Sequence, residues 1–581
     1  MSPPGSGQRP ARGQAQATEE VGRAGTGQKP ASSLVEATPP GGFAATLSSK
    51  ERDGRITAGI VALAFIAVLI GGAFAGLIFE GVGDPSGALS AFDPYLLRVA
   101  RFTLWQAALS TLLSVLPALF VARALARHPR FAGRTLILQL FAVPLALPAI
   151  VAALGVLSLY GRAGYFAGFL SGLSSGQWPG IYGLAGILVA HVFFNLPLAT
   201  RLFLEALQAV PGDQWRLASQ LGMGSGAAFR LIEWPALRQA LPGIAGLVFM
   251  LCVTSFTIVL TLGGGPAAST LEVAIYQALR FDFDPARAVA LTFLQVALTA
   301  VVVALLARLG TDMTGDANLP VAPRRYMPNS AAGTVLDAVL ILVSLLFVAG
   351  PMLATVTAGL QADLARLAAE DAVRRATVTS VLLAFLSAFL STALSLALAV
   401  ARRALSLGKR RPVLEFMTGT GAGFVLVVPP IVVGAGWFMA LRHFGDVFAV
   451  APVMVVAVNA VMAMPFAIRA VRPAYDAASE RHERLCAQLG IAGWTRLMLI
   501  DWPSLRRPMA TAFAFATALS LGDLGVIALF GSNEVQTLPY LLLARMGSYR
   551  TEDAAGLALW LGVVCLSLML VADRLGRERN A

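Results

Sequence analysis

The chain has 581 residues, of which 57% are hydrophobic and 13% charged, and its formal net charge is +12. Soluble proteins carry roughly a quarter charged residues, so this composition argues against a soluble globular enzyme. A positive excess can indicate nucleic acid, an acidic partner or membrane topology, and the positions of the basic residues decide among them.

Residues 1–54 are rich in Pro, Gly and Ser, and we expect them to form a disordered cytoplasmic extension. After them come apolar stretches of the roughly 20 residues that a helix needs to cross a bilayer. Helices are expected because in lipid each backbone polar group must be bonded within its own segment. We predict twelve spans, at residues 57–79, 102–122, 135–160, 180–200, 241–262, 288–307, 338–359, 378–401, 416–441, 447–468, 510–530 and 554–572.

The basic residues lie mainly in the loops that follow even-numbered spans. Those after spans 2 and 8 hold Arg123, Arg127, Arg130 and Arg134, and Arg402, Arg403, Lys409, Arg410 and Arg411. Positive residues gather on the cytoplasmic side of membrane proteins. We therefore expect a multi-pass membrane protein with both termini cytoplasmic, and the positive charge needs no nucleic acid to explain it.

Two loops in equivalent places, residues 201–240 and 469–509, repeat one another. RLASQLGMGSGAAFRLIEWPALRQAL at 216–241 aligns with RLCAQLGIAGWTRLMLIDWPSLRRPM at 484–509, with 11 of 26 positions identical. Such a repeat indicates a tandem duplication of one unit. The predicted fold is an all-α polytopic membrane protein of two homologous six-span halves, residues 55–310 and 332–581, joined by a cytoplasmic linker at 311–331.

Each repeated loop predicts a short amphipathic helix, a turn and a second helix. Apolar residues recur at helical spacing, and Gly222 or Gly490 stands where the first helix ends. Trp-Pro, at 234–235 and 502–503, then marks the start of the next span. The loop could merely cover the bundle at the membrane surface. Its occurrence twice, at equivalent places, favours a surface on which a soluble partner docks.

The sequence offers no catalytic or metal site. The three lysines all lack the following Ser or Thr that a Walker A loop requires: Lys29, Lys50 and Lys409. The cysteines form no CxxC pair and the histidines no HExxH motif. We expect a chain that is not an enzyme and binds no cofactor or metal.

The repeated loops resemble the EAA loop of ABC importer permeases of the binding-protein-dependent type, in the form with two fused units. The motif that carries the resemblance is Gly–x9–Ile–x2–Pro, present in both loops. In that family the loop supplies the coupling helix that enters a cleft of the ATP-binding subunit. The resemblance implies two copies of that subunit, docked on Arg216, Leu217, Ala218, Gly222, Ile232 and Pro235, and on Arg484, Leu485, Cys486, Gly490, Ile500 and Pro503.

Longer segments resemble the thiamine permeases of that family. They are HVFFNLPLATR (191–201), SFTIVLTLGGGPAASTLEVAIYQAL (255–279), FDPARA (283–288), GDLGVIALFG (522–531) and TLPYLLLARMGSYRTEDAA (537–555). The resemblance covers nearly the whole chain after residue 54. It implies a place in a bacterial inner membrane and import of thiamine or its phosphate esters. The implied partners are a periplasmic or lipoprotein thiamine-binding protein and the membrane lipid around the helices.

One feature departs from the family. Its loop usually opens Glu-Ala-Ala, where this chain has Arg216-Leu217-Ala218 and Arg484-Leu485-Cys486. An arginine needs an acidic partner, so we expect a carboxylate in the cleft of the ATPase.

Asp523 is the one ionisable residue inside a predicted span. A carboxylate in hydrocarbon is costly, so it should face the bundle interior or a water-filled path. A lone acid suits a substrate with a fixed positive charge, such as thiamine. Alternatively, Asp523 caps a helix break between Gly522 and Gly525. Its counterpart in the first half is Ser255, so the charge is contributed by one half alone.

Weaker candidates for the translocation path are His191 and Asn195 in span 4. Polar groups between membrane helices also make packing hydrogen bonds, so either role is open. Four prolines predict kinks in spans 3 and 9: Pro144, Pro148, Pro429 and Pro430.

Other functions remain open on the sequence alone. Within the same superfamily the chain could carry ferric iron or another small solute. A different class is an ion-coupled secondary transporter with Asp523 as the ion site, although such a protein has no reason to keep two matched docking loops. A membrane-anchored interaction protein without transport is disfavoured by the twelve spans and the duplication.

Overall fold

A computed structural model describes residues 49–83, 93–173, 177–308, 330–406, 411–425, 428–491, 493–532 and 534–576. They form helices joined by turns, with no strand in these ranges, and belong to one compact unit, Ala45–Ala581. Most of the predicted extension 1–54 and of the linker 311–331 lies outside the described residues, as do Lys409 and Arg410.

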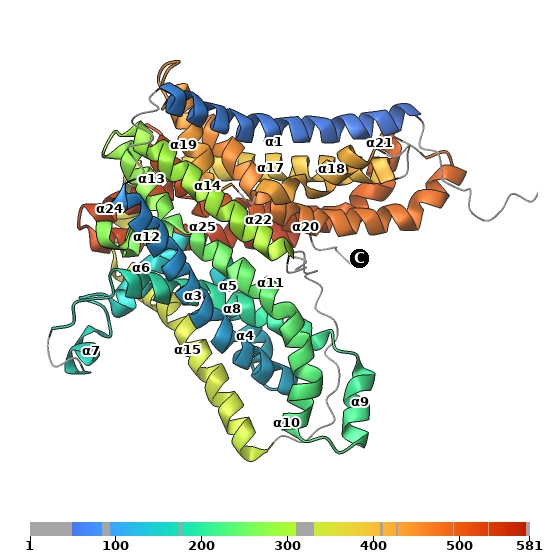
Figure 1. Ribbon diagram of the computed structural model, residues 1–581, viewed down its shortest axis with the longest axis horizontal. Helices are drawn as coiled ribbons and strands as arrows, with labels where there is room; N and C mark the ends of the chain where they lie inside the picture. The colour runs from blue at the N-terminus through green and yellow to red at the C-terminus, as the bar shows by residue number, and fades with distance from the viewer. Residues whose placement is uncertain are drawn as a thin grey trace, which may run out of the picture. The chain divides into compact units, whose positions relative to one another are not determined.

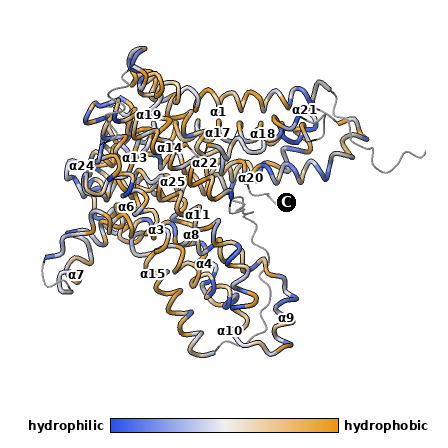
Figure 2. Tube along the Cα trace, in the orientation of Figure 1, coloured by the Kyte–Doolittle hydropathy of each residue, from blue (hydrophilic) through white to orange (hydrophobic). Residues whose placement is uncertain are grey.

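Within the described ranges, ten stretches of helix are long and apolar enough to cross a membrane, and Figure 2 shows that hydrophobic residues predominate along them. Their main helices are α1 (Ser49–Gly83), α3 (Pro94–Arg127), α8 (Leu184–Gln208), α11 (Trp234–Val253), α14 (Pro285–Arg308), α15 (Ala331–Gln361), α17 (Asp371–Ser406), α20 (Ala451–Gln488), α22 (Trp502–Gly522) and α25 (Thr551–Gly576). They coincide with ten of the twelve predicted spans. The chain is a multi-pass membrane protein.

The other two predicted spans, 3 and 9, are each broken at proline. Span 3 consists of α4 (Arg134–Leu140), α5 (Val143–Ala146) and α6 (Ala149–Tyr160), with a bend of 112° between Arg134–Ala146 and Ala149–Tyr160. Span 9 consists of α18 (Pro412–Phe424) and α19 (Pro430–Leu441). Pro148 and Pro429 stand directly before the second helix of each pair. A proline has no backbone N–H to donate, so the first helix cannot continue through it with its regular hydrogen bonds. The predicted kinks are therefore confirmed as breaks.

Spans 5 and 11 are also interrupted, at equivalent places in the two halves. The sequence analysis considered a break only in span 11, near Asp523. After α11 comes α12 (Phe256–Leu262), and after α22 comes α23 (Gly525–Phe530). Each is followed by a further helix, α13 (Leu271–Arg280) or α24 (Leu538–Gly547). The first N–H of each of these helices donates to a hydroxyl group: Leu271 N to Thr103 Oγ1 at 3.0 Å and Leu538 N to Ser380 Oγ at 2.7 Å. The two halves thus share their local anchors as well as their helices.

The first span of each half packs on the other half. Helix α1 lies against α17 and α19, and α15 lies against α3 and α6. Polar contacts fix both exchanges: Arg55 Nη1 donates to the Tyr475 hydroxyl at 3.1 Å, and Asp337 Oδ1 lies 3.3 Å from Arg127 Nη1. His128 Nε2 is 3.2 Å from the other oxygen of Asp337. The halves are therefore interlocked by their first spans.

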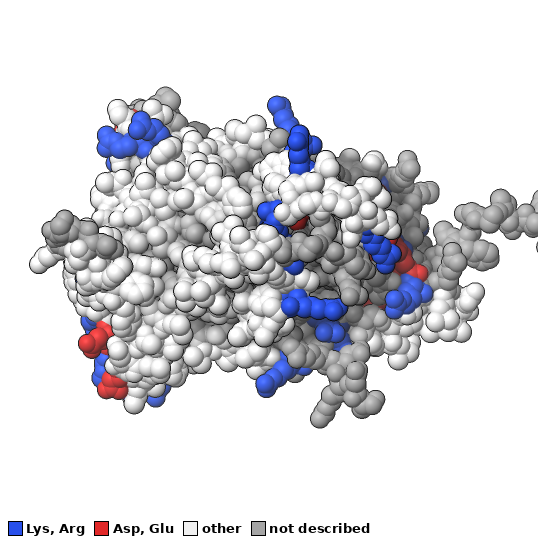
Figure 3. Space-filling model, turned by 90° about the horizontal axis from the view of Figure 1, so that it is seen from below, with Lys and Arg blue, Asp and Glu red and all other residues white. Residues whose placement is uncertain are grey.

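Within this unit the helices have two ends, which we call the loop end and the far end. The loop end carries α9 (Gly212–Gln220) and α21 (Gly493–Arg496), and the far end carries α13 and α24, drawn at the left of Figure 1. The loop ends of the two halves point in different directions, α21 to the upper right and α9 to the lower right. Figure 3 shows a broad face without charged residues between them and the far end, as a membrane-embedded surface requires.

Candidate functional site

The first repeated loop is a helix, a glycine turn and a second helix. Helix α9 ends where Gly222 takes a positive φ of 61°, and Met223 N donates to Ala218 O at 3.0 Å. This is the glycine-terminated C-cap, in which a residue without Cβ adopts the left-handed conformation. The chain continues through α10 (Ser225–Ala228) and one π-helical turn (Phe229–Glu233) into α11 at Trp234.

The second loop has the same form. Helix α20 ends where Gly490 has a φ of 63°, and Ile491 N donates to Cys486 O at 2.9 Å. Helix α21 and a π-helical turn (Leu497–Asp501) then lead into α22 at Trp502. Pro235 and Pro503 both occupy the first turn of the helix that follows, where a missing N–H costs nothing.

Apolar side chains stand out from the same two positions of each loop. Leu217 and Leu221 are 56% and 69% exposed, and their counterparts Leu485 and Leu489 are 47% and 63% exposed. The residues that follow the first leucine, Ala218 and Cys486, are buried. Each loop thus fixes one face to the bundle and leaves leucines uncovered, and exposed apolar patches of this kind mark surfaces for a partner.

The remaining loop residues named by the sequence analysis fall on both faces. Ile232 and Ile500 are half-buried. Arg216 is exposed, and its Nη1 lies 3.3 Å from Asp213 Oδ1, also exposed, so this pair is weak and open to exchange. Arg484 lies in α20, and its side chain is outside the described residues.

The two loops differ at their beginning. In the first, Pro211 and Gly212 separate α8 from α9, whereas α20 runs from its span into the second loop without interruption. Ser479 and Glu480 stand at the corresponding positions and allow an α-helix to continue. The first loop is therefore hinged from its span and the second is a rigid extension of it.

Each loop ends on a buried, ion-paired acid that the sequence analysis missed. Glu233 forms an ion pair with Arg123, and Asp501 Oδ2 lies 3.6 Å from Arg496 Nε. Both acids are buried and lie 268 residues apart, directly before Trp-Pro. The signal was present as Ile-Glu-Trp-Pro and Ile-Asp-Trp-Pro in the repeat. A second missed residue is Trp215, fully buried under the first loop, which has no aromatic counterpart in the second.

The broken spans of both halves meet near Asp523. A Cβ placed on Gly522 would lie 3.1 Å from Pro148 Cα, and one on Gly525 would lie 3.9 Å from both Phe256 Cδ1 and Pro430 Cβ. The second segments of spans 3, 5, 9 and 11 therefore begin close to one point between the halves. Glycine at 522 permits the close approach to Pro148, because a Cβ there would crowd its backbone.

Asp523 follows the last residue of α22, in the break before α23. Gly525 N donates to its Oδ1 at 3.2 Å, while Oδ2 is buried and has no hydrogen-bond partner among the described residues. The carboxylate thus caps the break with one oxygen and leaves the other uncommitted. Its counterpart Ser255 occupies the same position before α12 and carries no charge.

His191 and Asn195 make contacts within the first half. His191 Nδ1 lies 2.8 Å from Ser110 Oγ, and Asn195 Nδ2 lies 3.3 Å from Cys252 Sγ. The second half has an equivalent contact, in which Asn459 Nδ2 donates to Ser520 Oγ at 3.1 Å. These contacts join α8 to α3 and α11, and α20 to α22, so they are typical of helix packing.

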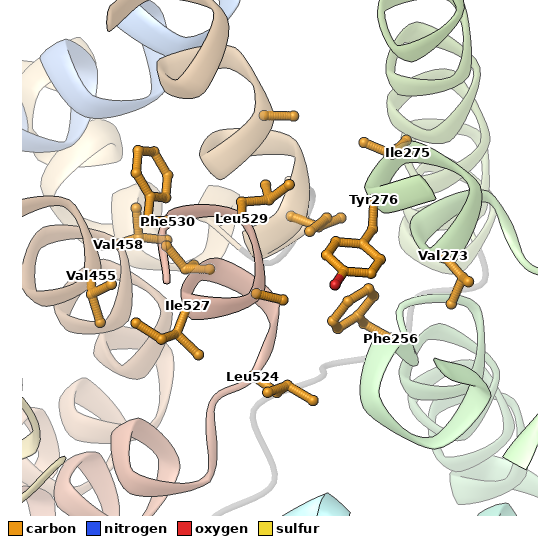
Figure 4. Close-up of a cluster of buried hydrophobic side chains, with 14 of the residues drawn as sticks. Phe256, Val273, Ile275, Tyr276, Val455, Val458, Leu524, Ile527, Leu529 and Phe530 are labelled. Carbon is orange, nitrogen blue, oxygen red and sulfur yellow. The ribbon is translucent and has the colours of Figure 1, made fainter. Parts of the chain in front are cut away.

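On the far-end side of Asp523 the halves meet through a seam of apolar side chains. Phe256 and Tyr276 of the first half lie opposite Leu524, Ile527 and Leu529 of the second (Figure 4). The two aromatic rings stack edge to face with centroids 5.5 Å apart. Arg280 Nη2 donates across the seam to Gly531 O at 3.3 Å. We call this contact between α12–α13 and α23 the seam, and in this conformation it separates Asp523 from the far end.

The described residues contain no cluster of three or more His, Cys, Asp or Glu able to hold a metal ion. The site therefore has two parts: a pair of equivalent loops with uncovered leucines, and an acid at the meeting point of four broken helices. A family model, binding-protein-dependent transport system inner membrane component, matches residues 118–315 and 404–577. The chain belongs to this family.

Individual relatives agree with that membership. A thiamine transport system permease protein ThiP from Brucella abortus is 58% identical over 523 residues, which cover 90% of this chain and 96% of the relative. The protein of that name from Escherichia coli is 41% identical, over 83% of this chain and 90% of its own. A sulfate transport system permease protein CysT from Salmonella typhimurium is 29% identical over 36% of this chain and 74% of its own. Permeases of this kind are transport subunits rather than enzymes.

Proposed function

We propose that this chain is the fused permease subunit of an ATP-driven importer that carries thiamine, or its phosphate esters, into the cytoplasm. The observation that carries the substrate is the match to thiamine permeases along nearly the whole length of both proteins. The match to the sulfate permease is weaker and covers only 36% of this chain. A cationic substrate also fits Asp523, an acid that lies between the halves and has one oxygen without a hydrogen-bond partner in the ranges that the structure describes.

The driving subunit is a separate ATPase, of which two copies dock on the loops around Gly222 and Gly490. The support for this step is the repeated backbone geometry of the loops and the leucines uncovered at the same positions in both. An apolar helix face is more stable when it is buried in a protein cleft than when it is exposed to water. The neighbouring Arg216 and Arg484 would pair with carboxylates of the cleft. Both loops then lie on the cytoplasmic side, with both termini.

The interlocked first spans suggest how loop movement reaches the seam. Closing the ATPase pair draws the two loop ends together, and each moving body consists of one half with the first span of the other half packed on it. Rocking about the middle of the molecule then separates α12–α13 from α23 at the far end. A binding protein on that side delivers the substrate to the opened seam.

Transport measured with several substrates tests this proposal. Proteoliposomes containing the permease, its ATPase and its binding protein should accumulate radiolabelled thiamine, and unlabelled thiamine or thiamine pyrophosphate should compete. Ferric iron and sulfate should neither be taken up nor compete. Accumulation of iron or sulfate without thiamine uptake would reject the substrate while keeping the importer.

A further inference from the structure

Glu272 is a buried acid for which neither packing nor the proposed docking gives a reason. It is 1% exposed, at the second position of α13, and its Oε1 has no hydrogen-bond partner among the described residues. Burying an ionised carboxylate without a partner is costly, and buried polar groups in proteins are normally paired. The buried Oε1 of Glu272 therefore gains no stabilising hydrogen bond among the described residues in this conformation.

The position of Glu272 relates it to the seam. It is four residues from Tyr276, which in turn is four residues from Arg280, so the three share one face of α13. Tyr276 stacks on Phe256 within the seam, and Arg280 bonds to the Gly531 carbonyl of the second half. Helix α13 itself packs against both α19 and α23. The face that carries Glu272 is thus the one that meets the second half.

A short series of contacts connects this face to Asp523. The Phe256 ring approaches Gly525, whose N–H is bonded to the Asp523 carboxylate. The order is an acid from the first half, two aromatic rings, and an acid from the second half. Neither acid has an acidic counterpart, since Pro539 and Ser255 stand at the equivalent positions. Carboxylates on both sides of aromatic rings are the chemistry that recognises an organic cation.

We propose that Glu272 is a second recognition residue for an aromatic cation, placed on the far-end side of the seam. It is covered in the conformation described here and exposed when α13 parts from α19 and α23. The cation meets Glu272 first, passes the faces of Tyr276 and Phe256, and reaches Asp523. This inference rests on the proposed function, because it assigns a residue to the same substrate.

A purely structural alternative is that Glu272 only complements the dipole of α13, since an acid in the first turn of a helix is mildly stabilising. Glu552, an exposed acid in the first turn of α25, offers a matched control for that role. Glu272→Gln keeps the shape and removes the charge. In the complete importer it should raise the apparent KM for thiamine about tenfold, with the maximal rate within about twofold, because one charge-assisted contact is lost. Glu552→Gln should leave both unchanged.

A KM for Glu272→Gln equal to that of the wild type would overturn the proposal, provided that the wild type takes up thiamine. Failure of the wild type itself would instead reject the proposed substrate. A second measurement needs no substrate and tolerates partial loss of activity. Glu272→Cys in the assembled importer should react with a cationic methanethiosulfonate added at the far end when ATP and vanadate trap the complex, and not in the nucleotide-free state.

The native cysteines provide the background for this labelling, since Cys252, Cys486 and Cys565 are all buried. The wild-type importer should therefore remain unlabelled in both states. Thiamine added with the reagent should slow labelling of Glu272→Cys. Equal labelling rates with and without trapping would show that the seam does not expose this position, and the proposal would be rejected.

Discussion

At the scale of single residues, Asp523 combines two roles that the sequence presents as alternatives. One carboxylate oxygen accepts the Gly525 N–H and shapes the break between α22 and α23, while the other has no hydrogen-bond partner in the described part of the chain. The sequence located this residue because a charge within an apolar span is conspicuous. It did not reveal Glu272 or Glu233, because both lie outside the predicted spans. Acids are common in such loops, and only the structure shows that these two are buried.

The two roles of Asp523 can be separated by Asp523→Asn. The amide oxygen of Asn can still accept the Gly525 N–H, so the turn is kept and the free energy of unfolding should change by less than about 1 kcal/mol. Loss of the charge should reduce thiamine uptake at least tenfold in proteoliposomes. Ser255→Asn, which introduces the same amide at the equivalent neutral position, is the control and should retain most uptake. If Asp523→Asn takes up thiamine at the wild-type rate, the charge has no role in transport and only the capping role of Asp523 remains.

At the scale of elements, spans and loops were predictable to different degrees. Apolar length located all twelve spans, and proline located the breaks before α6 and α19. The break before α12 has no proline at all, and the helices that pack on α12 are α6, α8 and α13 of the same half, so the sequence analysis did not predict it. The loops were found only because they occur twice, since one amphipathic stretch alone does not distinguish docking from lying on the membrane.

The glycine turns of the loops give a test at this scale. Gly222→Ala and Gly490→Ala introduce no clash, because open space surrounds both positions, but they force Ala into the left-handed region at a cost of about 1 kcal/mol each. The turn should open and reorient the leucines, so the ATPase should co-purify several-fold less well with the double variant.

Gly224→Ala is the matched control for these turns. It lies two residues after Gly222 in equally open space, but its φ is −72°, which alanine adopts freely. The amount of ATPase that co-purifies with Gly224→Ala should equal the amount that co-purifies with the wild type. Full recovery of the Gly222→Ala, Gly490→Ala complex would show that the turn geometry does not matter for docking.

At the scale of the whole molecule, the exchange of first spans determines how the halves depend on each other. Hydropathy and repeats predict two halves in sequence, but they contain no information on which half a given span packs against. The structure places α1 on the second half and α15 on the first, with a buried acid, Asp337, as one of the ties. Neither half can bury its apolar surface alone.

Separate expression of residues 1–320 and 321–581 tests this dependence. The two chains should co-purify when produced together, because the exchanged spans supply the contact that the linker supplies in the intact protein. Each chain produced alone should aggregate in detergent, as judged by size-exclusion chromatography. Two monodisperse halves that do not associate would contradict the exchange.

The most direct test of the account is the energy source of thiamine uptake in proteoliposomes. With the ATPase and the binding protein present, uptake should require ATP hydrolysis, persist when ionophores remove proton and sodium gradients, and stop when the docking leucines are replaced in Leu217→Ser, Leu485→Ser. The permease alone should transport nothing. Gradient-driven uptake of thiamine by the permease alone, without the ATPase, would contradict the account and identify a secondary transporter.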